Sequence, residues 1–240
     1  LNDDLSCDVV IIGAGFTGLR TALELSRASL NVIVLEKNII GYGASGRSGG
    51  QVNLGFKRDP HDIKRLFGPE MGLRMLRATS NASDELFSLI RQYGLNCDPV
   101  QKGWLKASHC KVALDRQKKQ QEQWAHEGVD LEFLNAQDIL SKTGANGYVG
   151  GLLYSKGGSI QPLSFTRELA RVCQDNGVLI FENSSALSVQ ETAQGVKIKS
   201  EHGSVKSDKV VICTNGYTDN AWSRLKETIV PVRSIQAATE

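Results

Sequence analysis

Three glycines near the start of the chain have the spacing that lets a backbone approach a phosphate group. They are Gly13, Gly15 and Gly18, within Gly-Ala-Gly-Phe-Thr-Gly. The first permits a tight turn, the second removes a side chain where a pyrophosphate would approach, and the third lets a helix pack closely on a strand. Phe16 and Thr17 would begin that helix, whose N-terminus carries partial positive charge.

An acidic residue follows these glycines at the distance typical of a ribose ligand. Residues 8–12 predict a buried strand, residues 16–28 an amphipathic helix, and residues 31–36 a second buried strand ending at Glu36. Together they form a βαβ unit with a right-handed crossover. In this context the glycine-rich turn predicts a dinucleotide site, with Glu36 accepting hydrogen bonds from ribose hydroxyls. The alternative is a glycine-rich turn that binds no ligand.

A second glycine-rich segment covers residues 41–55 and starts shortly after Glu36. Its bare backbone donors could wrap another side of a large ligand. Arg47 could neutralise the charge of a diphosphate. A flexible surface loop is the alternative interpretation.

The remaining pattern alternates between helices and short strands, and its character changes near residue 96. We interpret residues 96–161 as an inserted second domain. The strands at 186–190 and 196–199 alternate in polarity, as in an antiparallel meander. Helices are expected at 70–93, 111–127, 136–142 and 163–176, and strands at 103–107, 131–134, 178–181, 186–190, 196–199 and 209–213.

Composition argues against several classes of function. The net charge is +2, too small to favour binding to nucleic acid or to an anionic membrane. No apolar run is long enough to form a transmembrane segment. The five cysteines are scattered without a Cys-x-x-Cys pair, so no metal site is expected, and thiols in a reducing cytoplasm are the simplest interpretation.

The segment Gly-Ala-Ser-Gly-Arg-Ser-Gly-Gly-Gln at 43–51, together with 13–18, resembles the D-amino-acid-oxidase-like superfamily of FAD-dependent oxidoreductases. Its closest resemblance is to the gamma-glutamylputrescine oxidase branch, which typically has asparagine where this chain has Ser48. Residues 157–162, 182–186 and 210–216 also resemble that superfamily. The resemblance implies FAD as the cofactor, held by Gly13, Gly15, Phe16, Thr17, Gly18, Glu36, Lys37, Gly43, Ala44, Ser45, Arg47, Ser48, Gly49, Gly50, Gln51, Ala186, Thr214, Asn215 and Gly216.

The resemblance also implies an architecture. The fold class is α/β, with a Rossmann-like, glutathione-reductase-type FAD-binding domain and an inserted, incomplete α+β substrate domain. The expected boundaries are 1–95 and 162–220 for the FAD-binding domain, 96–161 for the inserted segment, and 221–240 for a truncated return to the substrate domain. Residues 229–233 resemble the start of further strands, so we expect the chain to be an N-terminal fragment.

The activity implied by the resemblance is oxidation of a small-molecule amine or amino acid, such as a gamma-glutamylputrescine-like amine. The product is an imine, which hydrolyses to an aldehyde or keto acid plus ammonia. Oxygen as the acceptor gives hydrogen peroxide, whereas another electron acceptor would make the enzyme a dehydrogenase. No catalytic residue is assigned, because the substrate amine can lose its proton to solvent. The rival interpretations are an NAD-dependent dehydrogenase and a truncated, non-catalytic dinucleotide-binding module, and the fragment alone is expected to be inactive.

Overall fold

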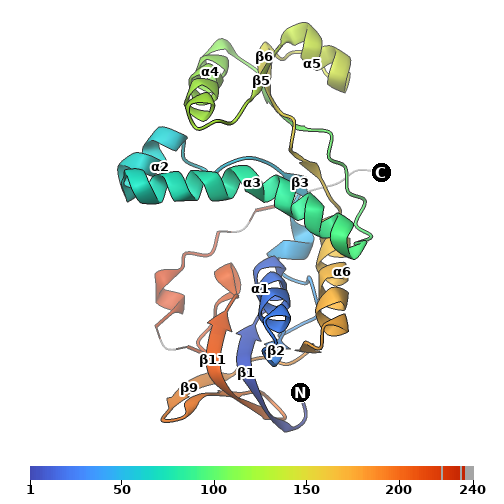
Figure 1. The fold of residues 1–240 in the computed structure, drawn as a ribbon, viewed down its shortest axis with the longest axis vertical. Coiled ribbons are helices and arrows are strands. Elements are labelled where there is room, and N and C mark those ends of the chain that lie inside the picture. Colours follow the sequence, from blue (N-terminus) through green and yellow to red (C-terminus); the bar gives the residue numbers. More distant parts are fainter. Residues whose placement is uncertain (223, 233, 236–240) are drawn as a thin grey trace. The chain divides into compact units, whose positions relative to one another are not determined.

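The computed structural model describes residues 1–222, 224–232 and 234–235, which fall into two compact units (Figure 1). The first unit consists of Leu1–Gly49, Leu95–Cys97 and the described part of 161–240. The second unit consists of Gly50–Gly94 and Asp98–Ile160.

The first unit is built on a six-stranded mixed sheet, in the order β8-β2-β1-β11-β10-β9. The strands β8, β2, β1 and β11 run parallel, and β9, β10 and β11 form an antiparallel meander. The expected α/β class is therefore confirmed. The bounds are β1 Asp4–Ile12, β2 Val32–Leu35, β8 Leu179–Phe181, β9 Ser188–Thr192, β10 Gly195–Lys199 and β11 Ser204–Ile212.

Two helices of the first unit pack against one another. They are α1, Phe16–Arg27, and α6, Pro162–Asp175. The rings of Phe16 and Phe165 meet edge to face with centroids 5.4 Å apart. Deeper in the contact, the Cys173 thiol donates to the carbonyl oxygen of Leu19 at 3.2 Å. This packing fixes the position of the start of α1 relative to the sheet. The first glycine-rich turn lies at that start.

The second unit holds a three-stranded antiparallel sheet, β4-β6-β5, and a two-stranded ribbon of β3 and β7. Its core gathers apolar side chains from helices and strands: Ile63, Leu76, Trp124, Leu131, Leu152 and Tyr154. The bounds are β3 Gln51–Val52, α2 Pro60–Phe67, α3 Pro69–Tyr93, β4 Trp104–Ser108, α4 Lys111–His126, β5 Glu132–Asn135, α5 Ala136–Thr143, β6 Gly150–Tyr154 and β7 Gly158–Ser159.

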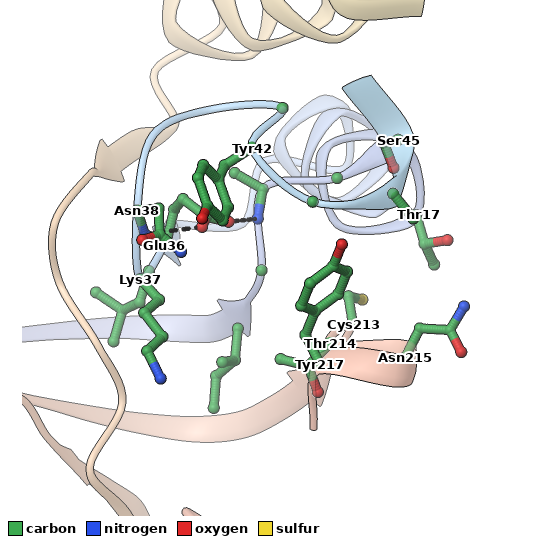
Figure 2. Close-up of a pocket in the computed structure, with 18 of the residues that line it drawn as sticks. Thr17, Glu36, Lys37, Asn38, Tyr42, Ser45, Cys213, Thr214, Asn215 and Tyr217 are labelled. Atoms are coloured by element: carbon green, nitrogen blue, oxygen red, sulfur yellow. Dashed lines mark hydrogen bonds between the residues drawn. The ribbon is translucent and has the colours of Figure 1, made fainter. Parts of the chain in front are cut away.

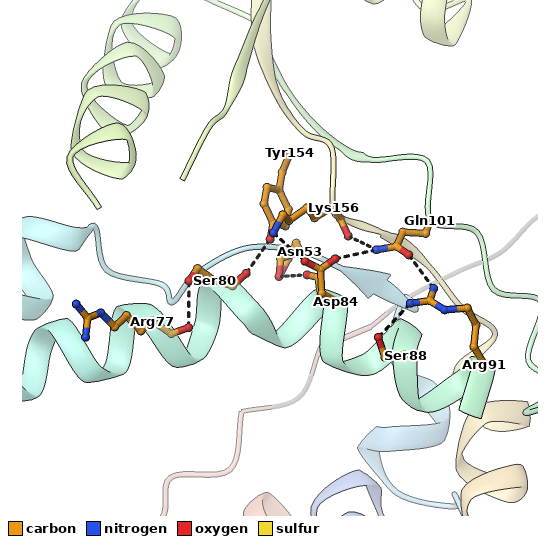
Figure 3. Close-up of polar contacts among 10 residues, drawn as sticks. Asn53, Arg77, Ser80, Asp84, Ser88, Arg91, Gln101, Tyr154 and Lys156 are labelled. Carbon is orange, nitrogen blue, oxygen red and sulfur yellow. Dashed lines mark hydrogen bonds and ion pairs between the residues drawn. The ribbon is translucent and has the colours of Figure 1, made fainter. Parts of the chain in front are cut away.

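Residues 50–94 belong to the second unit, although we expected them in the first part of the FAD-binding domain. Polar contacts explain why α3 joins this unit (Figure 3). Lys156 forms an ion pair with Asp84 at 2.8 Å, and the hydroxyl of Tyr154 donates to the carbonyl oxygen of Ser80 at 3.0 Å. The side chain of Gln101 donates to Asp84 as well, at 3.2 Å.

Several elements differ from the sequence-based expectation. Helix α2 and strands β3, β6 and β7 were not predicted, and β1 and β11 begin earlier than expected. The early parts of β1 and β11 pair with each other, from Asp4 with Ser204 to Cys7 with Ser207, although they are too polar to signal a buried strand. Residues 229–232 form no strand, and Arg233 lies outside the described residues.

In the part of the chain that the structure describes, none of the helices combines the length and apolar character needed to span a bilayer. The described residues also form three short 3₁₀ turns. They are η1 at Ala44–Arg47, η2 at Asn215–Tyr217 and η3 at Lys226–Thr228.

Candidate cofactor-binding site

A pocket of about 260 Å³ lies within the first unit, where β1, β2 and β11 end (Figure 2). Ligands of open α/β sheets bind at this carboxyl edge of the parallel strands. The pocket brings together segments that are far apart in the sequence. Its lining residues are 12–17, 35–38, 41–45, 185–186, 213–215, 217 and 219.

The first glycine-rich turn is closed by backbone contacts that exclude side chains. Gly13 has a φ of +106°, and its N–H donates to the carbonyl oxygen of Leu35 at 2.8 Å. A Cβ at Gly13 would lie 3.0 Å from the carbonyl oxygen of Cys213. A Cβ at Gly18 would overlap the carbonyl oxygen of Gly13. The backbone therefore accepts only glycine at both positions without rearrangement.

The N-terminus of α1 opens onto the pocket. Gly15 is its N-cap and has no capping side chain, while the N–H of Phe16 donates to Ser45 Oγ at 2.9 Å. Among the described residues, no protein group accepts a hydrogen bond from the N–H of Gly15 or Thr17. Unpaired N–H groups and the positive end of a helix dipole make this a site for an anion such as a diphosphate.

A serine from the second glycine-rich segment meets this helix start. A Cβ at Gly15 would lie 2.7 Å from Ser45 Oγ, so a side chain there would displace the serine hydroxyl. Gly43, Ala44 and Ser45 all line the pocket. Residues of both glycine-rich segments thus line one pocket.

The Glu36 carboxylate is held in place by two backbone groups. Its Oε2 accepts from the N–H of Ala14 and its Oε1 from the N–H of Asn38, both at 2.9 Å (Figure 2). Each carboxylate oxygen can accept more than one hydrogen bond. Glu36 can therefore bind hydroxyl donors of a ligand while it keeps both contacts.

The third side of the pocket comes from residues after β8 and β11. Ala186, Thr214 and Asn215 line it, and Gly216 follows directly without lining it. Asn215 has a φ of +43°, in the left-handed region that asparagine tolerates better than most residues. The Thr214 hydroxyl shares a hydrogen bond of 2.7 Å with the hydroxyl of Thr218, which ties the turn together.

Some expected cofactor-binding residues lie elsewhere. The Arg47 guanidinium stacks over the ring of Tyr42, 4.6 Å from its centroid, and does not line the pocket. Ser48 and Gly49 are exposed after η1, and Gly18 lies in the first turn of α1. Gly50 and Gln51 belong to the second unit, where Gln51 Oε1 accepts a hydrogen bond of 3.2 Å from the Trp104 indole.

The pocket also contains side chains that we did not expect from the sequence. Tyr42 is 45% exposed and Tyr217 is 57% exposed, and a Cβ at Gly43 would touch the Tyr217 ring at 3.4 Å. Asn38, Cys213 and Asp219 also line it, and Lys37 pairs with Asp219 at 3.7 Å. The signal that could have found the tyrosines is an aromatic residue next to a glycine in each turn.

The groups that line this pocket are suited to binding a ligand. Burial raises the pKa of the Cys213 thiol, so it is a neutral thiol at neutral pH and a poor nucleophile. Among the described residues, no three His, Cys, Asp or Glu side chains gather closely enough to hold a metal ion. The backbone N–H donors suit a diphosphate, and the Glu36 carboxylate is an acceptor suited to ribose hydroxyls.

Sequence comparison agrees with this geometry. The family model for FAD-dependent oxidoreductases matches residues 8–240. The chain is 33% identical to a probable oxidoreductase OrdL of Haemophilus influenzae, over 97% of this chain and 55% of that protein. It is 34% identical to the gamma-glutamylputrescine oxidoreductase of Escherichia coli, over 90% of this chain and 51% of that protein. The chain thus spans about half the length of these relatives.

Solved structures show the same fold at low sequence identity. A glycine oxidase from Geobacillus kaustophilus superposes with a TM-score of 0.77 at 18% identity, over 89% of this chain and 56% of that one. An L-proline dehydrogenase from P. horikoshii gives 0.76 at 19% identity, over 89% of this chain and 54% of that one.

Proposed function

The chain belongs to the DAO family of FAD-dependent oxidoreductases, and from this premise we propose that the protein oxidises an amine or an amino acid. A gamma-glutamylputrescine-like amine is the first candidate substrate, because the Escherichia coli relative at 34% identity carries that name. The product would be an imine that hydrolyses to an aldehyde or keto acid plus ammonia. The family assignment excludes the NAD-dependent dehydrogenase that the first glycine-rich turn alone left open.

The observation that carries the proposal is the cradle around the α1 N-terminus. Three residues fit a bound dinucleotide for separate reasons. Gly15 has no side chain, so a ligand can approach the backbone, while Ser45 supplies a hydroxyl and Glu36 a carboxylate fixed by hydrogen bonds. We propose that these residues hold the diphosphate and ribose of FAD, together with Thr17, Lys37, Gly43, Ala44, Ala186, Thr214 and Asn215. When bound, FAD supplies the two-electron acceptor for hydride from the substrate's α-carbon.

Some of the expected cofactor-binding residues do not line this pocket, and we propose a different role for them. We propose that Ser48 and Gly49 lie at the flavin end of the cofactor. We also propose that the inserted segment 96–161 contributes to substrate binding. A reducing cytoplasm fits the five cysteines, all of which are described and none of which forms a disulfide.

Anaerobic mixing of the purified protein with a panel of amines and amino acids tests the activity. The proposal predicts loss of the oxidised-flavin absorbance with at least one amine, and release of ammonia when an acceptor is supplied. Readmitting oxygen or adding a redox dye then separates an oxidase, which forms peroxide, from a dehydrogenase. The proposal would be overturned if no amine or amino acid reduced the flavin while hydroxy acids did. A protein that binds FAD but reacts with neither class would be the non-catalytic module.

A further inference from the structure

Tyr217 brings a phenol hydroxyl into the cofactor pocket from outside both glycine-rich segments. It is the last residue of η2, and hydrogen bonds hold the turn that carries it. The N–H of Tyr217 donates to the carbonyl oxygen of Thr214 at 2.9 Å, and the hydroxyl of Thr218 donates to the carbonyl oxygen of Asn215 at 2.7 Å. Figure 2 shows the ring extending from this turn into the pocket, with its hydroxyl end toward the start of α1.

The Tyr217 ring packs against the second glycine-rich segment. Gly43 is the N-cap of η1, and a Cβ there would lie 3.4 to 3.9 Å from carbon atoms of this ring. Two residues further along the chain, Ser45 Oγ accepts a hydrogen bond from the N–H of Phe16. Contacts within the first unit thus connect Tyr217 through η1 to the first turn of α1. The phenol therefore lies beside the helix N-terminus that suits a diphosphate.

The pocket has no free cation beside this helix N-terminus. Lys37 is the only cation among the described residues that line the pocket, and its ammonium group lies 3.7 Å from the Asp219 carboxylate. Arg47 stacks on the ring of Tyr42 and does not line the pocket. A diphosphate bound here therefore depends on neutral donors, which are backbone N–H groups and hydroxyls.

The Tyr217 hydroxyl is available as such a donor. In the part of the chain that the structure describes, no hydrogen bond engages this hydroxyl, and more than half of the side chain is exposed. Water can solvate the hydroxyl while the pocket is open, so leaving it without a protein partner costs little. When an anion binds, the same hydroxyl can form a charge-assisted hydrogen bond, which is stronger than one between neutral groups.

We propose that the Tyr217 hydroxyl donates a hydrogen bond to the diphosphate of FAD and holds it against the N-terminus of α1. This inference rests on the proposed FAD site and adds a binding residue to it. The contact between the ring and Gly43 positions the hydroxyl before the ligand arrives, which lowers the entropic cost of binding. The ring itself is not sufficient in this proposal, so phenylalanine cannot replace tyrosine.

Dilution of the purified holoprotein, followed by the fluorescence of released FAD, tests this contact. Tyr217→Phe should raise the dissociation constant of FAD about tenfold, because it removes a hydrogen bond to a charged group and keeps the ring. ADP has the diphosphate without the flavin, and its affinity as a competitor of FAD should fall by a similar factor. Tyr148→Phe, at a partly exposed tyrosine of the second unit outside the pocket, is the control and should bind both ligands as the wild type does.

Phosphorus NMR of the holoprotein supplies a second measurement. At least one phosphate resonance of bound FAD should shift in Tyr217→Phe, and neither should shift in Tyr148→Phe. The inference would be overturned by unchanged FAD affinity in Tyr217→Phe, by a loss of affinity for FAD but not for ADP, or by a loss without a shift of either resonance.

Flavin reduction by amines separates this inference from the proposed oxidation. If an amine reduces the flavin but Tyr217→Phe binds FAD as the wild type does, only the tyrosine contact is wrong. If Tyr217→Phe loses affinity for FAD and ADP but no amine or amino acid reduces the wild-type flavin, only the proposed oxidation is wrong.

Discussion

At the scale of single residues, the cofactor site depends on groups that are positioned before any ligand binds. The Glu36 carboxylate accepts one backbone N–H at each oxygen, from Ala14 and Asn38. Its orientation is therefore set by the turn and by the end of β2. Fixed hydrogen-bonding groups bind a ligand at lower entropic cost than mobile ones.

Replacing Glu36 by glutamine tests this role. The variant keeps one carbonyl acceptor but loses the charge and the second acceptor oxygen, leaving one of the two backbone donors unpaired. We expect FAD affinity of the apoprotein to fall about tenfold or more, since hydrogen bonds to charged groups contribute roughly 1.5–3 kcal/mol. Quenching of FAD fluorescence on binding measures this. Glu24→Gln, an exposed carboxylate on α1, is the control, and an equal loss in both variants would contradict the assignment.

The sequence predicted the backbone-dominated part of the site better than the rest. Gly13, Gly15 and Glu36 were found because local spacing specifies a turn between a strand and a helix. Tyr42 and Tyr217 were missed because their rings reach the pocket from two turns that only the tertiary fold brings together. For the same reason, nothing local shows that Arg47 stacks on Tyr42.

At the scale of elements, the contact between α1 and the turn before it sets the geometry of the cradle. The helix approaches the Gly13 carbonyl so closely at Gly18 that a Cβ there would overlap it. Helix α6 then holds α1 from the other side through Phe165 and Cys173. A change at either contact should move the helix N-terminus that faces the pocket.

Gly18→Ala should destabilise the first unit and weaken FAD binding together. Overpacking of this kind typically costs about 1–3 kcal/mol. Thermal unfolding with and without FAD measures both effects. The control is Glu24→Ala, at an exposed position of the same helix. Equal melting temperatures for the two variants would show that the close approach is not required.

The contact between α1 and α6 makes stability depend on alkaline pH. Burial raises the pKa of the Cys173 thiol from 9.0 to about 12. The folded state favours the neutral thiol, so this contribution to the free energy of unfolding is complete below pH 9. It is lost as the pH rises from about 9 to about 12.

Denaturant unfolding of the wild type and Cys173→Ser across that pH range checks the dependence. Serine does not titrate there and can still donate to the Leu19 carbonyl. We expect the wild type to lose more stability than the variant between pH 9 and 12. Parallel curves would contradict the assignment to Cys173.

Elements were predictable where their hydrophobic period was strong. Helices α1, α3, α4, α5 and α6 and the buried strands β1 and β2 match the expected positions within a few residues. Helix α2 was missed, whereas α5, which is also eight residues long, was predicted because Asn135 signals a helix cap. Strand β6 was missed because it opens with Gly150 and Gly151, which weaken the strand pattern. Strand β6 is nevertheless central in its sheet, paired on both sides by β4 and β5.

At the scale of the whole molecule, the two compact units differ from the expected domains in the placement of residues 50–94. Residues 50–94 begin within the second glycine-rich segment and continue from it without a break, so we expected them in the first unit. Long-range contacts such as Asp84 with Lys156 and Ser80 with Tyr154 join them to the second unit instead. Contacts of this kind cannot be inferred from hydrophobic periodicity, which is a local signal.

In our proposal, the pocket at the carboxyl edge of the first sheet holds FAD. The most direct measurement is the identity and stoichiometry of the nucleotide released by heating the purified protein, after saturation with an equimolar mixture of FAD, FMN and NAD. We expect FAD, at one per chain, and its loss in a Gly15→Val variant, because a Cβ at this position would lie 2.7 Å from Ser45 Oγ. Retention of NAD in preference to FAD, or equal retention of FAD by the variant, would contradict it.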